Sequence, residues 1–322
     1  MKKTILIVLS LILLFALIGW MLFDLFMGRP ELEKNPYDFG MKKLRETQII
    51  PAYSEALPIK PALKKITSVA TGPEGKIFVA GDGGVETFDF GGHLLNRISF
   101  PGIATCIAVM NNNILVIGME DHVELWNSSG IQVSSWKAID TSSVITSVAV
   151  NKQFIYVADA GEKIVYKYTL QGKMLARIGE KDPSRNIPGF IIPSPFFDVA
   201  ISPAGDLWVA NTGRYKLEKY GNDGSLLASW GEPSASIEGF AGCCNPSNFT
   251  FLPDGLFVTS EKGIERVKIY SQDGKFLALV AGPEAFDEGT HGLDLAATAN
   301  GWILVIDPSR NQLRIFLPLE KK

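Results

Sequence analysis

Two adjacent cysteines, Cys243 and Cys244, are the residues of this sequence best suited to chemistry, and they lie in the segment 238–246 (EGFAGCCNP). Neighbouring cysteines pair only through a strained eight-membered ring, which in an oxidising compartment would form a rigid, apolar lid for a ligand. If they are reduced, the same thiols are either unmodified structural residues or metal ligands, and Glu238, Glu261 and His291 are then the candidate additional ligands. Metal sites usually space their cysteines by two or more residues, and all three roles stay open.

A second set of polar residues follows the predicted second strands of the repeats described below. They are Asp159, Asn211, Arg214, Glu261, Lys262, Asp307 and Arg310. Loops at corresponding positions of a repeat meet on one face, so we expect these residues to ring one mouth. The same ligand-binding or partner-binding face is expected to carry Glu238, Cys243, Cys244, Asn245 and His291. The loop residues either contact a ligand or hydrogen-bond their own loops.

Other polar residues give weaker signals. The acidic cluster Glu284, Asp287 and Glu288 either binds a cation or is solvated. His93 and His122 stand apart from any carboxylate pair, and no Ser-His triad, P-loop or Rossmann fingerprint has a supporting context. The catalytic residues, if the protein is an enzyme, thus stay unknown from the sequence, and the one cofactor left open is a metal ion in a central channel.

Internal repeats supply the elements that must position these residues. Each repeat contains four short strands of alternating apolar residues; one copy reads 148–150, 154–159, 164–168 and 173–176. Other copies begin near Ile66, Ile103, Asp198, Phe249 and Leu293. A glycine precedes the fourth strand in five copies, at Gly92, Gly130, Gly172, Gly224 and Gly274. Their separation of 38 to 52 residues is typical of propeller blades. The pattern predicts an all-β fold, a six-bladed propeller.

Ring closure and the long links follow from the repeat. The sixth copy lacks a fourth strand, because only six residues follow Phe316. An open ring would expose strand edges, so we expect Arg45–Ile50 to supply the closing strand. The long links between blades are Glu180–Ile192, Glu232–Pro246 and Ala281–Gly292, all predicted on one loop-rich face.

Three segments resemble the NHL repeat: 157–168 (VADAGEKIVYKY), 209–220 (VANTGRYKLEKY) and 305–316 (VIDPSRNQLRIF). The resemblance covers about residues 45–317, and the layout is similar to uncharacterised bacterial membrane-anchored NHL-repeat proteins. It implies a six-bladed propeller behind a membrane anchor, and it implies little about activity, because one fold hosts many functions. Blade two departs from the repeat at 118–122 (GMEDH).

The N-terminal run Thr4–Phe23 has no charged residue, and twenty helical residues span roughly 30 Å, a bilayer core. Lys2 and Lys3 precede it and Trp20 lies near its far end, which predicts a cytoplasmic N-terminus. A cleaved signal peptide is the alternative, but no A-x-A-like site follows. We expect a single-pass anchor with the cytoplasmic N-terminus at 1–28, a linker at 29–44 and an extracytoplasmic propeller at 45–322, periplasmic in a Gram-negative cell.

The net charge of the propeller limits the classes of partner that we expect. Without Lys2, Lys3, Arg29 and Asp24 the chain carries 28 Lys and Arg against 33 Asp and Glu, a net charge of −5. Nucleic acid is not an expected partner, because binding it requires a basic surface. We expect a binding or scaffold module that takes a protein or small ligand on the loop-rich face. The alternatives are a metal-dependent propeller enzyme (lyase or lactonase) and the extracytoplasmic subunit of a membrane redox complex that uses the vicinal cysteines.

Overall fold

The computed structural model describes residues 2–26, 52–185, 187–234 and 236–319. The chain divides into two units, residues 1–44 and 45–322. The first contains one helix, α1 (Lys2–Phe26), in which Leu, a strong helix former, is the commonest residue. In the part of the chain that the structure describes, no helix combines the length and apolarity that a membrane crossing requires.

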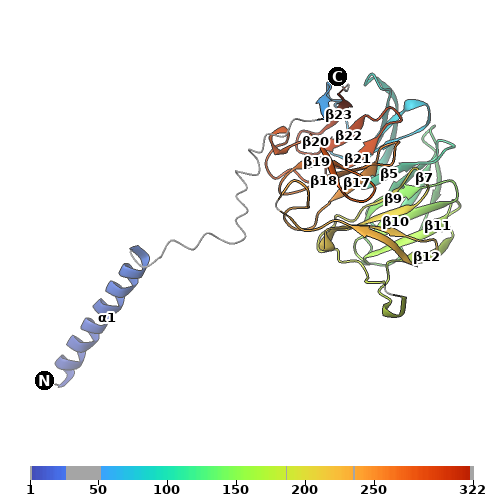
Figure 1. Ribbon diagram of the computed structural model, residues 1–322. Coiled ribbons are helices and arrows are strands. Elements are labelled where there is room, and N and C mark those ends of the chain that lie inside the picture. The colour runs from blue at the N-terminus through green and yellow to red at the C-terminus, as the bar shows by residue number, and fades with distance from the viewer. Residues whose placement is uncertain (1, 27–51, 186, 235, 320–322) are drawn as a thin grey trace. The chain divides into compact units, whose positions relative to one another are not determined.

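The second unit is a six-bladed β-propeller (Figure 1). Blade one contains β2 (Ile66–Thr71), β3 (Ile77–Phe88) and β4 (Leu94–Ile103). Blade two contains β5 (Cys106–Val109), β6 (Leu115–Gly118), β7 (Val123–Trp126) and β8 (Gln132–Ser135). Blade three contains β9 (Ile145–Val150), β10 (Phe154–Asp159), β11 (Ile164–Thr169) and β12 (Met174–Ile178).

The remaining blades follow the same antiparallel order. Blade four contains β13 (Val199–Ile201), β14 (Leu207–Asn211), β15 (Lys216–Tyr220) and β16 (Leu226–Trp230). Blade five contains β17 (Asn248–Phe251), β18 (Phe257–Glu261), β19 (Arg266–Tyr270) and β20 (Phe276–Ala281). Blade six contains β21 (Leu295–Ala297), β22 (Ile303–Asp307), β23 (Gln312–Pro318) and β1 (Tyr53–Glu55). Short 3-10 helices lie at Pro73–Gly75, Pro183–Arg185, Thr212–Arg214 and Pro283–Ala285.

Blade one has one long strand in place of two short ones. Residues 77–81 of β3 pair with β2, and residues 82–88 pair with β4. Gly83 and Gly84 both have positive φ at the change of partner, where a side chain would be strained. The single strand β3 thus takes the place of the second and third strands of the other blades.

The ring closes at both its inner and its outer edge. Each innermost strand contacts the innermost strand of the next blade, and β21 contacts β2. At the outer edge, Ser54 of β1 pairs antiparallel with Leu317 of β23. The predicted closing strand at Arg45–Ile50 lies outside the described residues, and the described closing strand is β1, further along the chain. Tyr53 packs against the core between blades five and six, an anchor that extended-strand propensity alone does not reveal.

The core consists of six apolar clusters, one between each pair of neighbouring blades. The second and third strands are almost entirely buried, as in β10 and β11, whereas the fourth strands are largely exposed, as in β12 with Met174 and Leu175. The predicted turn glycines adopt the left-handed region, among them Gly172 at φ 85° and Gly224 at φ 80°. Burial between sheets, without disulfides among the described residues, therefore stabilises the ring.

Candidate functional site

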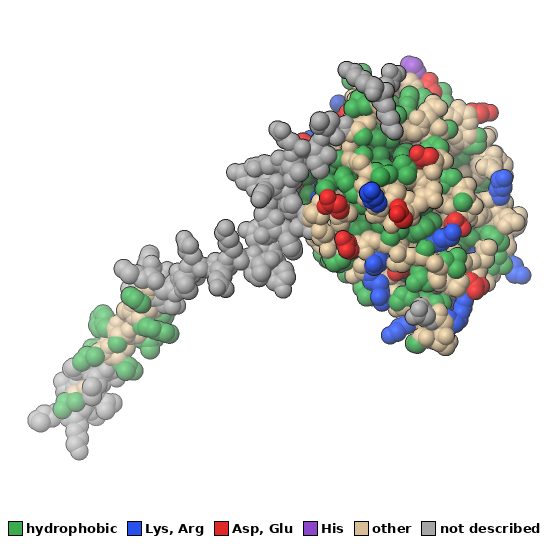
Figure 2. Space-filling view, in the orientation of Figure 1, with side chains coloured by type: hydrophobic (Ala, Val, Ile, Leu, Met, Phe, Trp, Pro, Cys, Tyr) green, Lys and Arg blue, Asp and Glu red, His purple; other side chains and the backbone are tan. Residues whose placement is uncertain are grey.

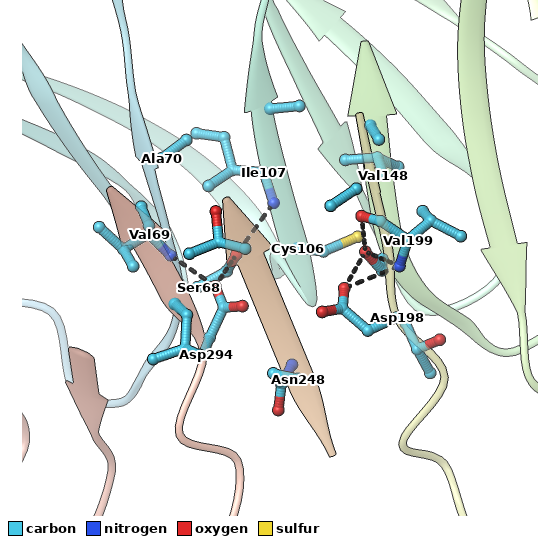
Figure 3. Close-up of a pocket in the computed structure, with 18 of the residues that line it drawn as sticks. Ser68, Val69, Ala70, Cys106, Ile107, Val148, Asp198, Val199, Asn248 and Asp294 are labelled. Atoms are coloured by element: carbon cyan, nitrogen blue, oxygen red, sulfur yellow. Dashed lines mark hydrogen bonds between the residues drawn. The ribbon is translucent and has the colours of Figure 1, made fainter. Parts of the chain in front are cut away.

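A cavity of about 450 Å³ runs through the centre of the propeller and is lined by the innermost strands of all six blades (Figure 3). Each blade supplies a small polar side chain at one equivalent position, which lies in the innermost strand or directly before it and faces the same position of the second strand. We call this set the lumen ring: Ser68, Cys106, Ser147, Asp198, Asn248 and Asp294.

Hydrogen bonds connect lumen-ring residues to neighbouring blades. Asp294 of blade six accepts the Ser68 hydroxyl of blade one at 2.6 Å and the Val69 backbone N–H at 2.8 Å. Ser68 Oγ in turn accepts the Ile107 N–H of blade two at 3.2 Å. These hydrogen bonds therefore join blade six to blade one, where the propeller closes, and blade one to blade two.

Asp198 repeats this arrangement on the other side of the lumen. Its carboxylate accepts the Ser147 hydroxyl of blade three at 2.5 Å and the Phe249 N–H of blade five at 2.7 Å. It also accepts the N–H of Val199, the next residue along the chain, at 2.9 Å. Each lumen carboxylate is therefore rigidly oriented by donors that carry no charge.

The environment of both carboxyl groups disfavours their charged form. Burial raises the pKa of Asp198 to about 7, and the negative charge of Asp294 adds to this rise. Burial raises the pKa of Asp294 to about 6. None of the described residues that line the cavity is Lys, Arg or His. The two carboxylates thus share a cavity in which no basic side chain compensates their charge.

Asn248 belongs to blade five, which lies between blade four with Asp198 and blade six with Asp294. Figure 3 shows the two aspartates on either side of it. Its side-chain oxygen is buried and accepts no hydrogen bond from the described residues. Cys106 completes the ring, and burial raises the pKa of its thiol to about 12, so this thiol stays protonated. A ligand that donates hydrogen bonds and carries positive charge fits this set of groups.

The predicted loop residues Asp159, Asn211, Glu261 and Asp307 end the second strands β10, β14, β18 and β22 and are fully buried. Three of them accept a backbone N–H from the preceding link at 2.9 Å: Val144 to Asp159, Ile191 to Asn211 and Ala241 to Glu261. Asp307 accepts the N–H of Arg310 at 3.2 Å. These side chains attach the loops to the blades, which is the structural alternative that the sequence left open.

Glu261 also belongs to a buried ionic cluster that the sequence did not predict. Its carboxylate pairs with Arg266 at 2.8 Å and with Lys268 at 2.6 Å, and all three side chains are at most 3% exposed. Burial lowers the pKa of Lys268 to about 8, although Glu261 opposes this fall. Lys268 also donates to the carbonyl of Gly239 at 2.6 Å, so the cluster supports the link that carries the cysteines.

The two predicted arginines contact neighbouring links. Arg310 pairs with Asp287 at 2.6 Å, while Glu284 and Glu288 are exposed beside it. Arg214 donates to the carbonyl of Pro188 at 3.4 Å. These contacts place the second-to-third-strand loops and the long links on the same face, as predicted.

Three side chains meet at the mouth of the channel on this face. The Lys262 ammonium lies 4.8 Å from the centre of the Phe196 ring, and the His291 ring lies edge-on to Phe196 at 6.3 Å. Phe196 lines the central cavity, so the mouth and the lumen are continuous. Lys262 and His291 are predicted from the sequence to lie on this face, whereas Phe196 has no sequence feature that distinguishes it from a core aromatic.

The cysteine segment lies beside this mouth. Cys243 is exposed and Cys244 is buried, both thiols are free, and their sulfur atoms lie 2.8 Å apart. Asn245 attaches the segment to the Lys262 loop, and Glu238 is exposed. Among the described residues, no three or more His, Cys, Asp or Glu side chains are grouped to hold a metal ion.

The sequence missed the lumen ring. The triplets 67–69 (TSV), 105–107 (TCI) and 146–148 (TSV) are alike, and aligning all six copies on them would have placed Asp198, Asn248 and Asp294 in register. The two aspartates directly precede strands of only three residues, and their separation of 96 residues conceals that they share one cavity.

Comparisons with known proteins bear on the fold. The sequence matches no protein-family model and no curated protein. A streptogramin B lyase structure is 12% identical, with 84% of this chain and 88% of that chain covered and a TM-score of 0.56. A virginiamycin B lyase from Staphylococcus aureus is also 12% identical, with 84% and 90% covered and a TM-score of 0.55. A protein of unknown function from Bacteroides thetaiotaomicron is 12% identical, with 82% and 72% covered and a TM-score of 0.57. At these identities the likeness shows a shared propeller fold alone.

Proposed function

We propose that this protein is a binding module, an NHL-type propeller that takes a small ligand with a protonated amine through its loop-rich face into the central channel. The observation that carries the proposal is the pair Asp198 and Asp294, two carboxylates in one cavity whose described lining contains no basic side chain. A protonated amine supplies the missing positive charge, and it supplies a hydrogen-bond donor for the Asn248 side-chain oxygen, which accepts none from the described residues.

A bound amine stabilises the ionised form of both carboxyl groups, and that gain is the source of its affinity. Burial otherwise favours the neutral form of both acids, and the charge of Asp294 further disfavours ionisation of Asp198, so a ligand cation relieves an existing penalty. A rigid site loses little conformational freedom on binding, because the neighbouring blades already orient both carboxylates.

The test uses the full chain and two matched probes, 1,4-diaminobutane and its uncharged counterpart 1,4-butanediol, titrated by calorimetry. We expect the diamine to bind and the diol not to bind. Asp198→Asn and Asp294→Asn keep the size and the acceptor oxygen, so each should weaken diamine binding at least about tenfold, or 1.4 kcal/mol. Asp254→Asn, in an exposed turn, is the matched control and should leave binding unchanged.

Two outcomes would contradict this proposal. Equal binding of diol and diamine would remove charge as the basis of recognition. Binding of Ca²⁺ that depends on Asp198 and Asp294, with no diamine binding, would support the metal-dependent enzyme alternative instead.

We also propose that the propeller is extracytoplasmic and attached to the membrane by the N-terminal segment. The support is the uncharged run Thr4–Phe23 behind Lys2 and Lys3 in the sequence. A reporter fused after Lys322 should be active outside the cytoplasm only, and the mature protein should retain its N-terminal residues. A mature mass that begins near residue 28 would indicate cleavage instead. The acidic and basic side chains interspersed on the propeller face in Figure 2 suit a soluble domain beside a membrane.

A further inference from the structure

The link between blades four and five brings two consecutive thiols together. In an extended chain, neighbouring side chains point to opposite sides. Here Gly242 has φ 71° and Cys244 has φ 63°, so the backbone turns and the two sulfur atoms lie 2.8 Å apart. A non-glycine residue in this region is uncommon, and such strain is concentrated at functional sites.

Hydrogen bonds hold the link on both sides of the thiols. Asn245 donates to the carbonyls of Ala241 and Lys262 at 2.5 and 2.9 Å, and its side-chain oxygen accepts the Lys262 N–H at 3.0 Å. The Tyr215 hydroxyl donates to the carbonyl of Gly242 at 2.9 Å. The thiols are therefore held in contact by groups that do not depend on either sulfur.

The two thiols differ in access. Cys243 is exposed, whereas Cys244 is 2% exposed beneath it. An external reagent therefore reaches Cys243 first, and Cys244 reaches only Cys243. This asymmetry matches the division between an attacking and a resolving thiol.

We propose that Cys243 and Cys244 are a redox-active pair that undergoes thiol–disulfide exchange with a disulfide-containing partner, with Cys243 attacking and Cys244 resolving. This inference is independent of amine binding in the lumen.

The exchange balances in two steps. The Cys243 thiol loses its proton and its sulfur attacks one sulfur of the partner disulfide, forming a mixed disulfide and releasing the first partner thiolate. The Cys244 sulfur, after losing its proton, then attacks the Cys243 sulfur and releases the second partner thiolate. The pair loses two electrons and two protons, and the partner disulfide is reduced to two thiols.

The surroundings of Cys243 set the pH dependence of the exchange rate. The hydrogen bond with Cys244 raises the pKa of Cys243, burial and electrostatic repulsion from Cys244 add to the rise, and the nearby Lys262 ammonium opposes it. The titratable groups near Cys243 are thus Lys262, Cys244 and Tyr215 of blade four. Since the thiolate is the nucleophile, exchange should accelerate as the pH rises toward the thiol pKa.

The experiment uses the reduced full chain and oxidised glutathione as the probe, with alkylation and tryptic mass spectrometry at timed intervals. The peptide 220–262 contains both cysteines, and Cys106 lies in a separate peptide. In the wild type we expect this peptide to become two hydrogens lighter and to resist alkylation. The Cys244→Ser variant should accumulate glutathione on Cys243, and the Cys243→Ser variant should react at least tenfold more slowly. Lys262→Gln should slow the reaction severalfold, and Glu232→Gln, an exposed change in the same link, should match the wild type.

Two results would overturn the proposal. One is a wild-type pair that remains fully reduced in excess oxidised glutathione at pH 8. The other is capture of glutathione by Cys243→Ser as fast as by Cys244→Ser, which would remove the division of roles. Circular dichroism of each variant verifies that the propeller is folded, so a slow reaction is not mistaken for misfolding.

Discussion

Arg314 and Glu55 form a two-point ion pair where the propeller ring closes, with distances of 2.7 Å from Nε to Oε1 and 2.6 Å from Nη2 to Oε2. Arg314 lies in β23 and Glu55 in β1, so the pair joins strands from opposite ends of the domain sequence. The Arg314 side chain is 3% exposed and its guanidinium lies 4.6 Å from the centre of the Phe286 ring. The contact combines a planar bidentate pair with aromatic packing, which Lys would not reproduce.

Replacing Glu55 should weaken this closure. The Glu55→Gln change leaves the buried Arg314 with only a distant carboxylate, Asp307 at 3.7 Å, and we expect a loss of about 2 kcal/mol in the free energy of unfolding. Urea unfolding of the full chain measures this change in the free energy of unfolding. Glu74→Gln, which removes an exposed pair with Lys76, is the control and should cause no measurable change. Equal effects of the two variants would show that the Arg314–Glu55 pair does not stabilise the closure.

The cluster under the cysteine link should be more sensitive. Glu261→Gln leaves Arg266 and Lys268 buried beside each other without their shared carboxylate, and we expect a loss of about 3 kcal/mol. Glu232→Gln, an exposed change in the same link, is the control. Unfolding in guanidinium chloride measures the free energy of unfolding of both variants. A Glu261→Gln variant as stable as the wild type would refute the stabilising role of this cluster.

Stability should fall as the pH rises through the range set by Asp198. Its pKa is about 7 in the folded protein and about 3.9 in an unfolded chain, so folding takes up a proton between these values. The contribution is fully present below about pH 4 and is lost as the pH approaches about 7. From pH 5 to pH 8 we expect the wild type to lose on the order of 2 kcal/mol that Asp198→Asn does not lose. Identical pH profiles of unfolding would contradict the elevated pKa.

Amine binding should have the opposite pH dependence. Between pH 6 and pH 8 Asp198 and Asp294 lose their protons, and the ionised carboxylates attract a cation. The affinity for 1,4-diaminobutane should therefore rise about tenfold over this range, which is 1.4 kcal/mol. Calorimetry in buffers of different ionisation enthalpy should also detect proton release on binding. An affinity independent of pH would place the amine away from these carboxylates.

The sequence by itself determined the propeller and its turns. Alternating apolar residues specify strands, and the recurring glycines, such as Gly172 and Gly224, mark turns that require positive φ. These signals are local, within about ten residues, so a single copy of the repeat already contains them. The order of strands and loops within one repeat also predicts that the cysteine link, the loop carboxylates and the long loops lie on one face.

Only the tertiary structure decided which polar residues share a site. Asp159 and Glu261 resemble ligand contacts in the sequence, but both are buried because the links need acceptors for their backbone N–H groups. Asp198 and Asp294 have no distinguishing feature in the sequence, and they line the same cavity because ring closure brings blades four and six around it. Strand periodicity fixes which face a side chain occupies, whereas distances across a closed ring depend on how all six blades pack.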